Sequence, residues 1–139
     1  MTKRRLEEDL LEKAKPRYSK RTKKQFKNTD LLVWRPLVSH LRDWPLALCD
    51  MRTVSREDIV EADLISPGFQ GENMFLYFSP HPKFYFRDRQ SPDEVWIFKQ
   101  FDSMDGVAKH CPHGSFQNPD AAADEPRRMS IDVAALVIY

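Results

Sequence analysis

A chain of 139 residues, 41% hydrophobic and 12% aromatic, has enough apolar surface for one core and is too short for two ordinary domains. These fractions argue against a disordered chain, and no apolar run approaches the roughly 20 residues that cross a bilayer. We therefore expect a soluble cytoplasmic protein with no membrane span and no signal peptide. Cys49 and Cys111 are expected to be free thiols.

The formal net charge of +1 hides two segments of opposite charge. Up to Lys27 the chain has eleven Lys and Arg against four acids, whereas the remainder has eleven against seventeen. Over Arg5–Lys15, three leucines lie on one side of a possible helix, which Pro16 would end: Leu6, Leu10 and Leu11. Residues 1–28 are therefore predicted to be a basic helical arm and linker. Residues 29–139 are predicted to be a separate domain.

The same basic arm offers an alternative function, because clustered Lys and Arg attract phosphate groups. Only Tyr18 and Phe26 could stack on bases, and no base-reading module lies nearby. A solvated helix and linker is therefore favoured, and nucleic-acid binding is considered unlikely.

Beyond Asp30, short runs rich in aliphatic and aromatic residues are separated by proline and turn residues. They predict about six strands, over residues 31–34, 46–48, 73–79, 83–87, 94–101 and 130–139. Residues 55–64 are predicted to form a short capped helix or turn, and residues 119–126 a polar connector. This spacing indicates a mainly β fold, an antiparallel sheet or partial jelly roll preceded by the N-terminal helix. The unpaired edges of a partial barrel favour self-association.

His113 is followed fifteen residues later by Arg128 and Ser130, which is typical of half an oxidative active site. A non-haem Fe(II) oxygenase usually holds its metal with two histidines and one carboxylate. The first two ligands often occur as His-x-Asp or His-x-Glu. None of the four histidines, His40, His81, His110 and His113, is followed two places on by an acid.

Other site chemistries find less support. His110 and His113, with Cys111 between them, suggest zinc, but no second ligand pair stands at metal-finger spacing. The chain has no glycine-rich phosphate loop, no Gly-x-Ser-x-Gly elbow and no His-Glu-x-x-His motif.

Six blocks then occur in a specific order: Leu32-Val33-Trp34-Arg35-Pro36-Leu37, Arg42 to Asp50, Pro92-Asp93-Glu94-Val95, Phe98-Lys99-Gln100-Phe101-Asp102-Ser103, Pro112-His113-Gly114-Ser115-Phe116 and Arg128-Met129-Ser130-Ile131. Together they resemble the C-terminal half of the fungal hydroxylase/desaturase family that includes the gibberellin desaturase and the aspergillic-acid hydroxylase/desaturase. The bacterial cephem methoxylase subunit is a more distant relative. The resemblance covers roughly Thr29 to Tyr139.

The resemblance implies a 2-oxoglutarate-dependent Fe(II) oxygenase of secondary metabolism that acts on a small metabolite. By it, His113 corresponds to the distal iron ligand, while Arg128 and Ser130 hold the far carboxylate of 2-oxoglutarate. Two positions depart from the family: Ala134 stands where another arginine is usual, and Arg127 where proline is usual.

The His-x-Asp pair of the family lies in an N-terminal half that has no counterpart in this sequence. We therefore expect a truncated chain that is inactive alone. The alternative is a non-catalytic, degenerate paralogue or binding module. Four further motif residues have no role that the pattern explains, and we expect them to pack in the core around a buried Arg-to-Asp interaction: Trp34, Arg35, Trp44 and Asp102.

Overall fold

The computed structural model describes residues 27–139. The predicted helical arm of residues 1–28 therefore lies outside the described residues, except for Lys27 and Asn28. Within the described part, no helix is long and apolar enough to cross a membrane.

The described chain is mainly β, as predicted. It forms eight strands and two short 3-10 helices: β1 (Asn28–Pro36), β2 (Leu46–Cys49), η1 (Met51–Thr53), η2 (Arg56–Asp58), β3 (Ile59–Ser66), β4 (Phe69–Leu76), β5 (Phe84–Phe86), β6 (Trp96–Asp102), β7 (His113–Ser115) and β8 (Ser130–Ile138).

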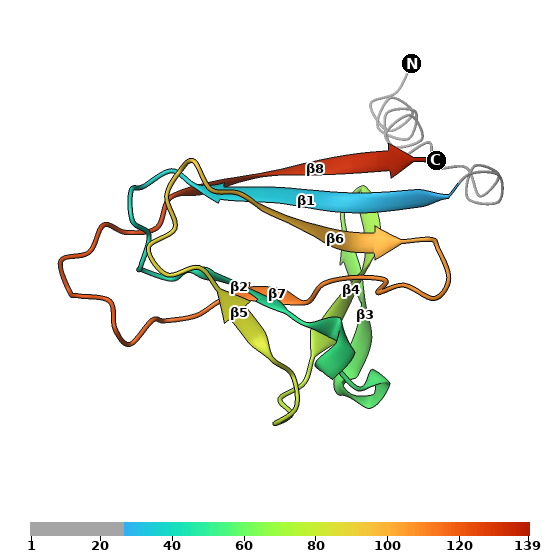
Figure 1. The fold of residues 1–139 in the computed structure, drawn as a ribbon. Coiled ribbons are helices and arrows are strands. Elements are labelled where there is room, and N and C mark those ends of the chain that lie inside the picture. The colour runs from blue at the N-terminus through green and yellow to red at the C-terminus, as the bar shows by residue number, and fades with distance from the viewer. Residues whose placement is uncertain (1–26) are drawn as a thin grey trace, which may run out of the picture.

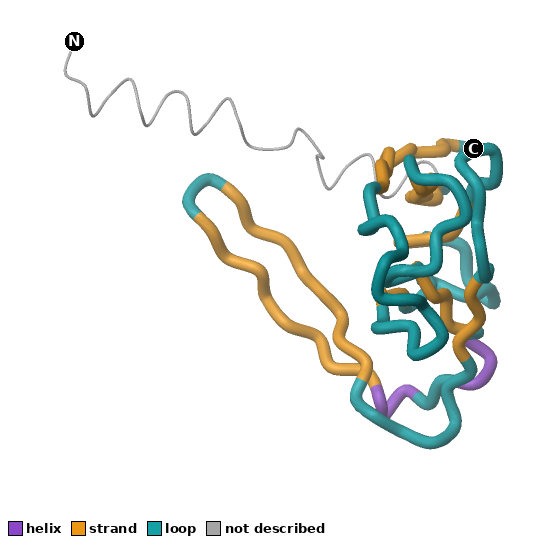
Figure 2. The backbone as a smooth tube through the Cα atoms, turned by 90° about the vertical axis from the view of Figure 1, so that its left-hand side faces the viewer, coloured by secondary structure: helices purple, strands orange, loops and turns teal. Residues whose placement is uncertain are grey.

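The strands form three antiparallel sheets, in the orders β6-β1-β8, β5-β2-β7 and β3-β4. Figure 1 shows the two three-stranded sheets as two layers, with the β3–β4 hairpin to one side. In the view of Figure 2 this hairpin projects away from the body of the protein.

Strand β1 is the centre of the first sheet. Leu32 lies opposite Phe98 of β6 on one side and Ala134 of β8 on the other. Because side chains alternate along a strand, Leu32 and Trp34 point to the same face. That face contributes Leu32, Trp34 and Phe98 to a buried cluster with Leu41 and Leu46. The core therefore lies between the first two sheets.

The structure contains two strands that the sequence did not predict. Residues 59–64 were expected to continue a capped helix or turn, but only Arg56–Asp58 is helical, with the Ser55 side chain capping it. Strand β3 then begins at Ile59 and pairs with β4 around a turn in which Gly68 has a φ of 80°. Pro67 and Gly68 are the two central residues of this turn, and Gly adopts the positive φ that the chain reversal requires. Pairing with β4 stabilises β3 where the local pattern favoured a helix. The other unpredicted strand is the short β7.

The expected buried Arg-to-Asp interaction is wrong. Asp102 is buried, but its carboxylate accepts hydrogen bonds from Lys99 Nζ at 2.9 Å and from the Met104 amide at 2.8 Å. Arg35 is exposed and donates to the Pro92 carbonyl oxygen. The lysine hydrogen bond and the amide hydrogen bond keep the pKa of Asp102 below its usual value.

The two tryptophans of the same motifs differ in burial. Trp34 packs in the core as expected, whereas Trp44 is 46% exposed and has a φ of 46°. This left-handed backbone lies in the turn that leads to the buried Pro45, and it directs Trp44 away from the core.

Replacing Phe98 with alanine should strongly destabilise the fold, because its ring is buried between the sheets. We expect a loss of about 3–5 kcal/mol in the free energy of unfolding, measured by urea titration. The control is Phe78→Ala, since Phe78 is 98% exposed and its loss should change stability by no more than about 0.5 kcal/mol. Equal effects of the two changes would contradict the assigned core.

Candidate functional site

His113 is the first residue of β7 and lies opposite Leu48 of β2. Its ring packs against the buried Phe98, with ring centroids 4.6 Å apart and planes tilted by 57°. Nδ1 lies 3.0 Å from the Cys111 carbonyl oxygen. Because a carbonyl oxygen only accepts hydrogen bonds, Nδ1 is the donor in this contact, and Nε2 is the ring nitrogen that does not take part in it. This is the arrangement in which a histidine binds a metal ion through Nε2.

Arg128 is held beside the same strand. Its Nη1 donates to the Trp44 carbonyl oxygen at 3.1 Å and to the Ser115 hydroxyl. Its backbone amide donates to Asp43 Oδ2 at 3.0 Å. Among residues 27–139 no acidic side chain forms an ion pair with its guanidinium. The guanidinium is therefore available to an anionic ligand.

The contact with Ser115 brings Arg128 and His113 to one side of β7. Residues two apart on a strand point the same way, so Ser115 and His113 share a face and lie about 7 Å apart along the chain. Ser130 is placed differently. It begins β8 opposite Pro36, and no hydrogen bond joins its hydroxyl to His113 or Arg128 in the described structure. Ala134, at the position where the family has an arginine, lies opposite Leu32.

A groove of about 900 Å³ opens beside His113. It is lined by β4 and the residues that follow it, including Phe75, Tyr77 and Phe78. Residues 110–114 also line it, together with Ile59, Phe84 and Gln100. Most of these side chains are apolar, so the groove is suited to a largely apolar small molecule.

His110 also lines this groove, and both of its ring nitrogens are buried without a hydrogen-bond partner among the described residues. Burial disfavours the charged imidazolium and lowers the pKa of His110 below its usual value. The sequence named His110 only as a zinc candidate. The burial of both ring nitrogens without a hydrogen-bond partner depends on tertiary packing, so no local sequence pattern predicts it.

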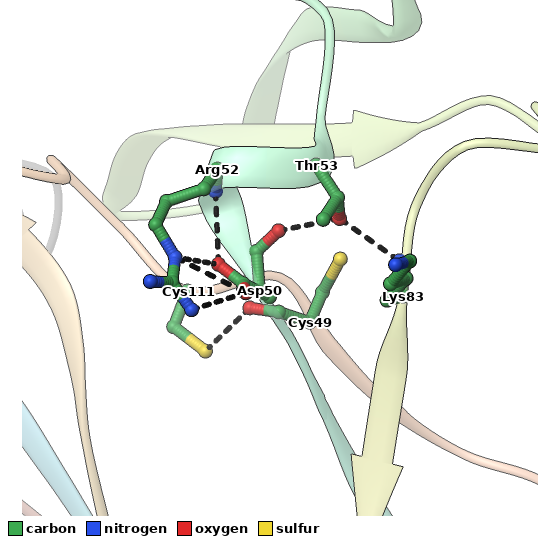
Figure 3. Close-up of polar contacts among 6 residues, drawn as sticks. All are labelled: Cys49, Asp50, Arg52, Thr53, Lys83 and Cys111. Carbon is green, nitrogen blue, oxygen red and sulfur yellow. Dashed lines mark hydrogen bonds and ion pairs between the residues drawn. The ribbon is translucent and has the colours of Figure 1, made fainter.

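A polar network supports the segment that precedes β7. The Cys111 thiol donates to the Cys49 carbonyl oxygen at 3.5 Å, and Arg52 makes hydrogen bonds with both carboxylate oxygens of Asp50 (Figure 3). The hydrogen bonds from the Arg52 side chain and amide lower the pKa of Asp50 to about 2. Both cysteines are free, as predicted, and burial raises the pKa of each thiol.

The described residues do not complete a metal site. No group of three His, Cys, Asp or Glu side chains in residues 27–139 is arranged to hold a metal ion. His113 therefore stands there as one potential ligand without partners, and the zinc alternative with His110 and Cys111 gains no support. Ser115 and Phe98, which contact Arg128 and His113, lie within the sequence blocks but were not predicted as site residues.

Comparison with known proteins identifies the chain. A family model described as an oxidoreductase/YMDC permease-like domain matches residues 2–138. Aspirochlorine biosynthesis protein N of Aspergillus oryzae is 36% identical over 110 residues, which cover 77% of this chain and 46% of that protein. The Fe(II)/2-oxoglutarate-dependent dioxygenase nvfI of Aspergillus novofumigatus is 40% identical over 112 residues, covering 76% of this chain and 38% of that protein.

A comparison with solved structures points to the same family as the sequence relatives. The iron and alpha-ketoglutarate-dependent endoperoxidase NvfI superposes with a TM-score of 0.76 at 32% identity, over 93% of this chain and 49% of that one. The fold and the motifs thus define an oxygenase-like oxidoreductase domain. The chain belongs to the fungal Fe(II)/2-oxoglutarate-dependent hydroxylase/desaturase family, and it spans less than half the length of these relatives.

The lowered pKa of His110 has a consequence for stability. The unfolded chain takes up a proton on this residue near pH 6.5, whereas the folded chain does so only at a lower pH. Its contribution to stability is therefore complete above about pH 6.5 and is lost as the pH falls toward the folded value. We expect the melting temperature to fall between pH 7.5 and pH 5, and to fall less in His110→Phe.

The matched control is His81→Gln, because His81 is exposed and is not itself one of the residues that line the groove. This variant should keep the full pH dependence of the parent protein. A His110→Phe variant with the same pH dependence as the parent would contradict the burial argument.

Proposed function

We propose that this chain contributes the distal half of an Fe(II)/2-oxoglutarate oxygenase site, acting on a small, largely apolar metabolite. In this proposal His113 is one iron ligand, and Arg128, with Ser130 nearby in sequence, binds the far carboxylate of 2-oxoglutarate. Membership of the family and the contact that brings Arg128 beside the β7 strand support these roles.

The position of Arg128 is the observation that supports the proposal most directly. Its guanidinium is anchored by two neutral groups, the Trp44 carbonyl oxygen and the Ser115 hydroxyl, and has no acidic partner among the described residues. A planar guanidinium can give two parallel hydrogen bonds to a carboxylate, which a lysine cannot reproduce. Ser115, which accepts a hydrogen bond from this guanidinium, lies about 7 Å along β7 from His113, and a short dicarboxylate has a suitable length to extend from the arginine toward His113.

The described residues do not by themselves fit an iron ion, because no three of their His, Cys, Asp or Glu side chains are grouped to hold a metal. No chemical step through iron is therefore assigned to this chain. What its residues do in the proposal is bind and orient the co-substrate carboxylate and offer an apolar groove to the metabolite. We also propose that the two three-stranded sheets are part of a jelly roll, since they are antiparallel and enclose the core between them.

If Arg128 binds the co-substrate, Arg128→Ala should weaken 2-oxoglutarate binding to the purified chain by at least about tenfold, the loss of a charge-assisted hydrogen-bond pair. Arg128→Lys should recover only part of that loss, because the two parallel bonds are not restored. Isothermal titration calorimetry with 2-oxoglutarate measures both effects.

The neighbouring Arg127 supplies the control, since it has the same charge and is also exposed. Arg127→Ala should bind 2-oxoglutarate like the parent chain. If Arg127→Ala and Arg128→Ala weaken binding equally, the effect is general attraction of an anion and the specific role of Arg128 is wrong.

The shortage of ligands predicts that the purified 139-residue chain, supplied with Fe(II), ascorbate and O2, does not convert 2-oxoglutarate to succinate above the protein-free rate. Succinate is measured by mass spectrometry in the presence and absence of the chain. Succinate formation that disappears in His113→Ala would overturn this expectation and would assign catalysis to the chain itself.

A further inference from the structure

Trp44 belongs to the Asp43-Trp44-Pro45 motif, and packing in the core does not explain its presence there. Its side chain is 46% exposed, and its φ of 46° lies in the left-handed region that residues other than glycine rarely occupy. A non-glycine residue at such a φ is strained, and the strain persists only where the surrounding structure maintains it. The backbone conformation of Trp44 is therefore the feature that needs a structural reason.

The turn that contains Trp44 is fixed on both sides. Before it, the buried Asn118 donates a hydrogen bond from Nδ2 to the Arg42 carbonyl oxygen at 3.2 Å. After it, Pro45 is fully buried, and its own ring fixes its φ. Because Trp44 lies between these two anchored residues, its left-handed φ is imposed by the fold.

The carbonyl oxygen of Trp44 accepts a hydrogen bond from the side chain of Arg128. The donor is Nη1, at 3.1 Å, and the Ser115 hydroxyl accepts a second hydrogen bond from the same nitrogen. The residue before Trp44 contacts the other end of the arginine, because Asp43 Oδ2 accepts the backbone amide of Arg128 at 3.0 Å. The Asp43–Trp44 turn therefore holds both the main chain and the guanidinium of one arginine.

These contacts determine which edge of the guanidinium a ligand can use. Nη1 carries two N–H groups, and it already has two acceptors, the Trp44 carbonyl oxygen and the Ser115 hydroxyl. No hydrogen bond within the described chain uses Nε or Nη2 of Arg128. Nε and Nη2 together present a parallel pair of N–H groups, which is the pair that a carboxylate accepts in a bidentate contact. The free edge is therefore the one that suits a carboxylate.

We propose that Trp44 is a positioning residue for Arg128, and that it acts through its left-handed backbone and not through its ring. The carbonyl oxygen that this backbone presents holds Nη1, and the Nε/Nη2 edge is thereby directed to the far carboxylate of the co-substrate. This role rests on the proposed function of Arg128 as the residue that binds 2-oxoglutarate. It adds that the direction of the guanidinium, in addition to its charge, is set by the protein.

Two substitutions that both remove the indole ring separate the backbone of Trp44 from its side chain. Glycine adopts a left-handed φ without strain, whereas valine, which is branched at Cβ, does not. Trp44→Gly should keep the dissociation constant of 2-oxoglutarate within about twofold of the parent value, while Trp44→Val should raise it at least about fivefold through the displaced hydrogen bond. Isothermal titration calorimetry measures both. Equal weakening in the two variants would assign the effect to the lost ring and overturn the proposal, and so would unchanged affinity in both.

A second measurement follows the guanidinium without any co-substrate. Phenylglyoxal modifies accessible arginine side chains, and peptide mass spectrometry gives the rate at Arg128 and, in the same molecules, at the exposed Arg127. Trp44→Val should raise the ratio of the Arg128 rate to the Arg127 rate at least about threefold, because Nη1 loses an acceptor. Trp44→Gly should leave this ratio at the parent value.

The phenylglyoxal ratio also distinguishes a failure of this proposal from a failure of the proposed function. If the parent chain does not bind 2-oxoglutarate, or if Arg128→Ala binds it equally well, the co-substrate role of Arg128 is wrong, and the ratio alone decides whether Trp44 positions the guanidinium. The same ratio in the parent chain, Trp44→Gly and Trp44→Val would overturn the positioning role. A melting curve shows that each variant is folded, and Trp44→Ala replaces Trp44→Val if the valine variant is not, with the same direction of change and a smaller effect.

Discussion

The structure depends on the double pairing of β1. All nine of its residues pair with β8 on one side and six of them, Thr29 to Trp34, also pair with β6 on the other, although these strands come much later in the chain. This pairing puts Leu32 against Phe98, and Phe98 in turn packs against the His113 ring. The orientation of the candidate ligand is therefore a consequence of sheet register, because a shift of one residue would turn Phe98 to the other face.

The pairing of β1 with β8 explains how Arg128 comes to lie beside β7, the strand that carries His113. Leu37 donates its amide to the Met129 carbonyl oxygen at 2.8 Å, which extends the β1–β8 pairing toward Arg128. Asp43 and Trp44, in the turn after β1, then bind the amide and the guanidinium of Arg128. The arginine reaches the side of β7 because these two segments are joined, and its charge is left for a ligand rather than for a protein carboxylate. Residues 27–139 contain no group of three His, Cys, Asp or Glu side chains that could hold a metal ion.

Sequence reasoning predicted the strands with clear apolar runs and missed those that depend on a partner. Strands β1, β2, β4, β5, β6 and β8 coincide with the expected runs, with ends displaced by a few residues. Strand β3 was read as helix or turn because Ser55 and the acids after it are a helix-capping pattern, which the structure uses for one short 3-10 turn only. Asp102 is buried, as expected, but its ion-pair partner is Lys99, three residues before it on the same strand, and not an arginine.

Taken alone, the sequence determined that the described region is mainly β, that its cysteines are free, and that its ordered motifs belong to an oxygenase family, because alternation and motif order are local properties. Tertiary structure decided that Arg128 and His113 lie on one side of β7, that His110 is buried without a hydrogen-bond partner, and that the outer face of the first sheet is apolar. Each of these follows from contacts between segments distant in the chain, and such contacts leave no signature in local composition.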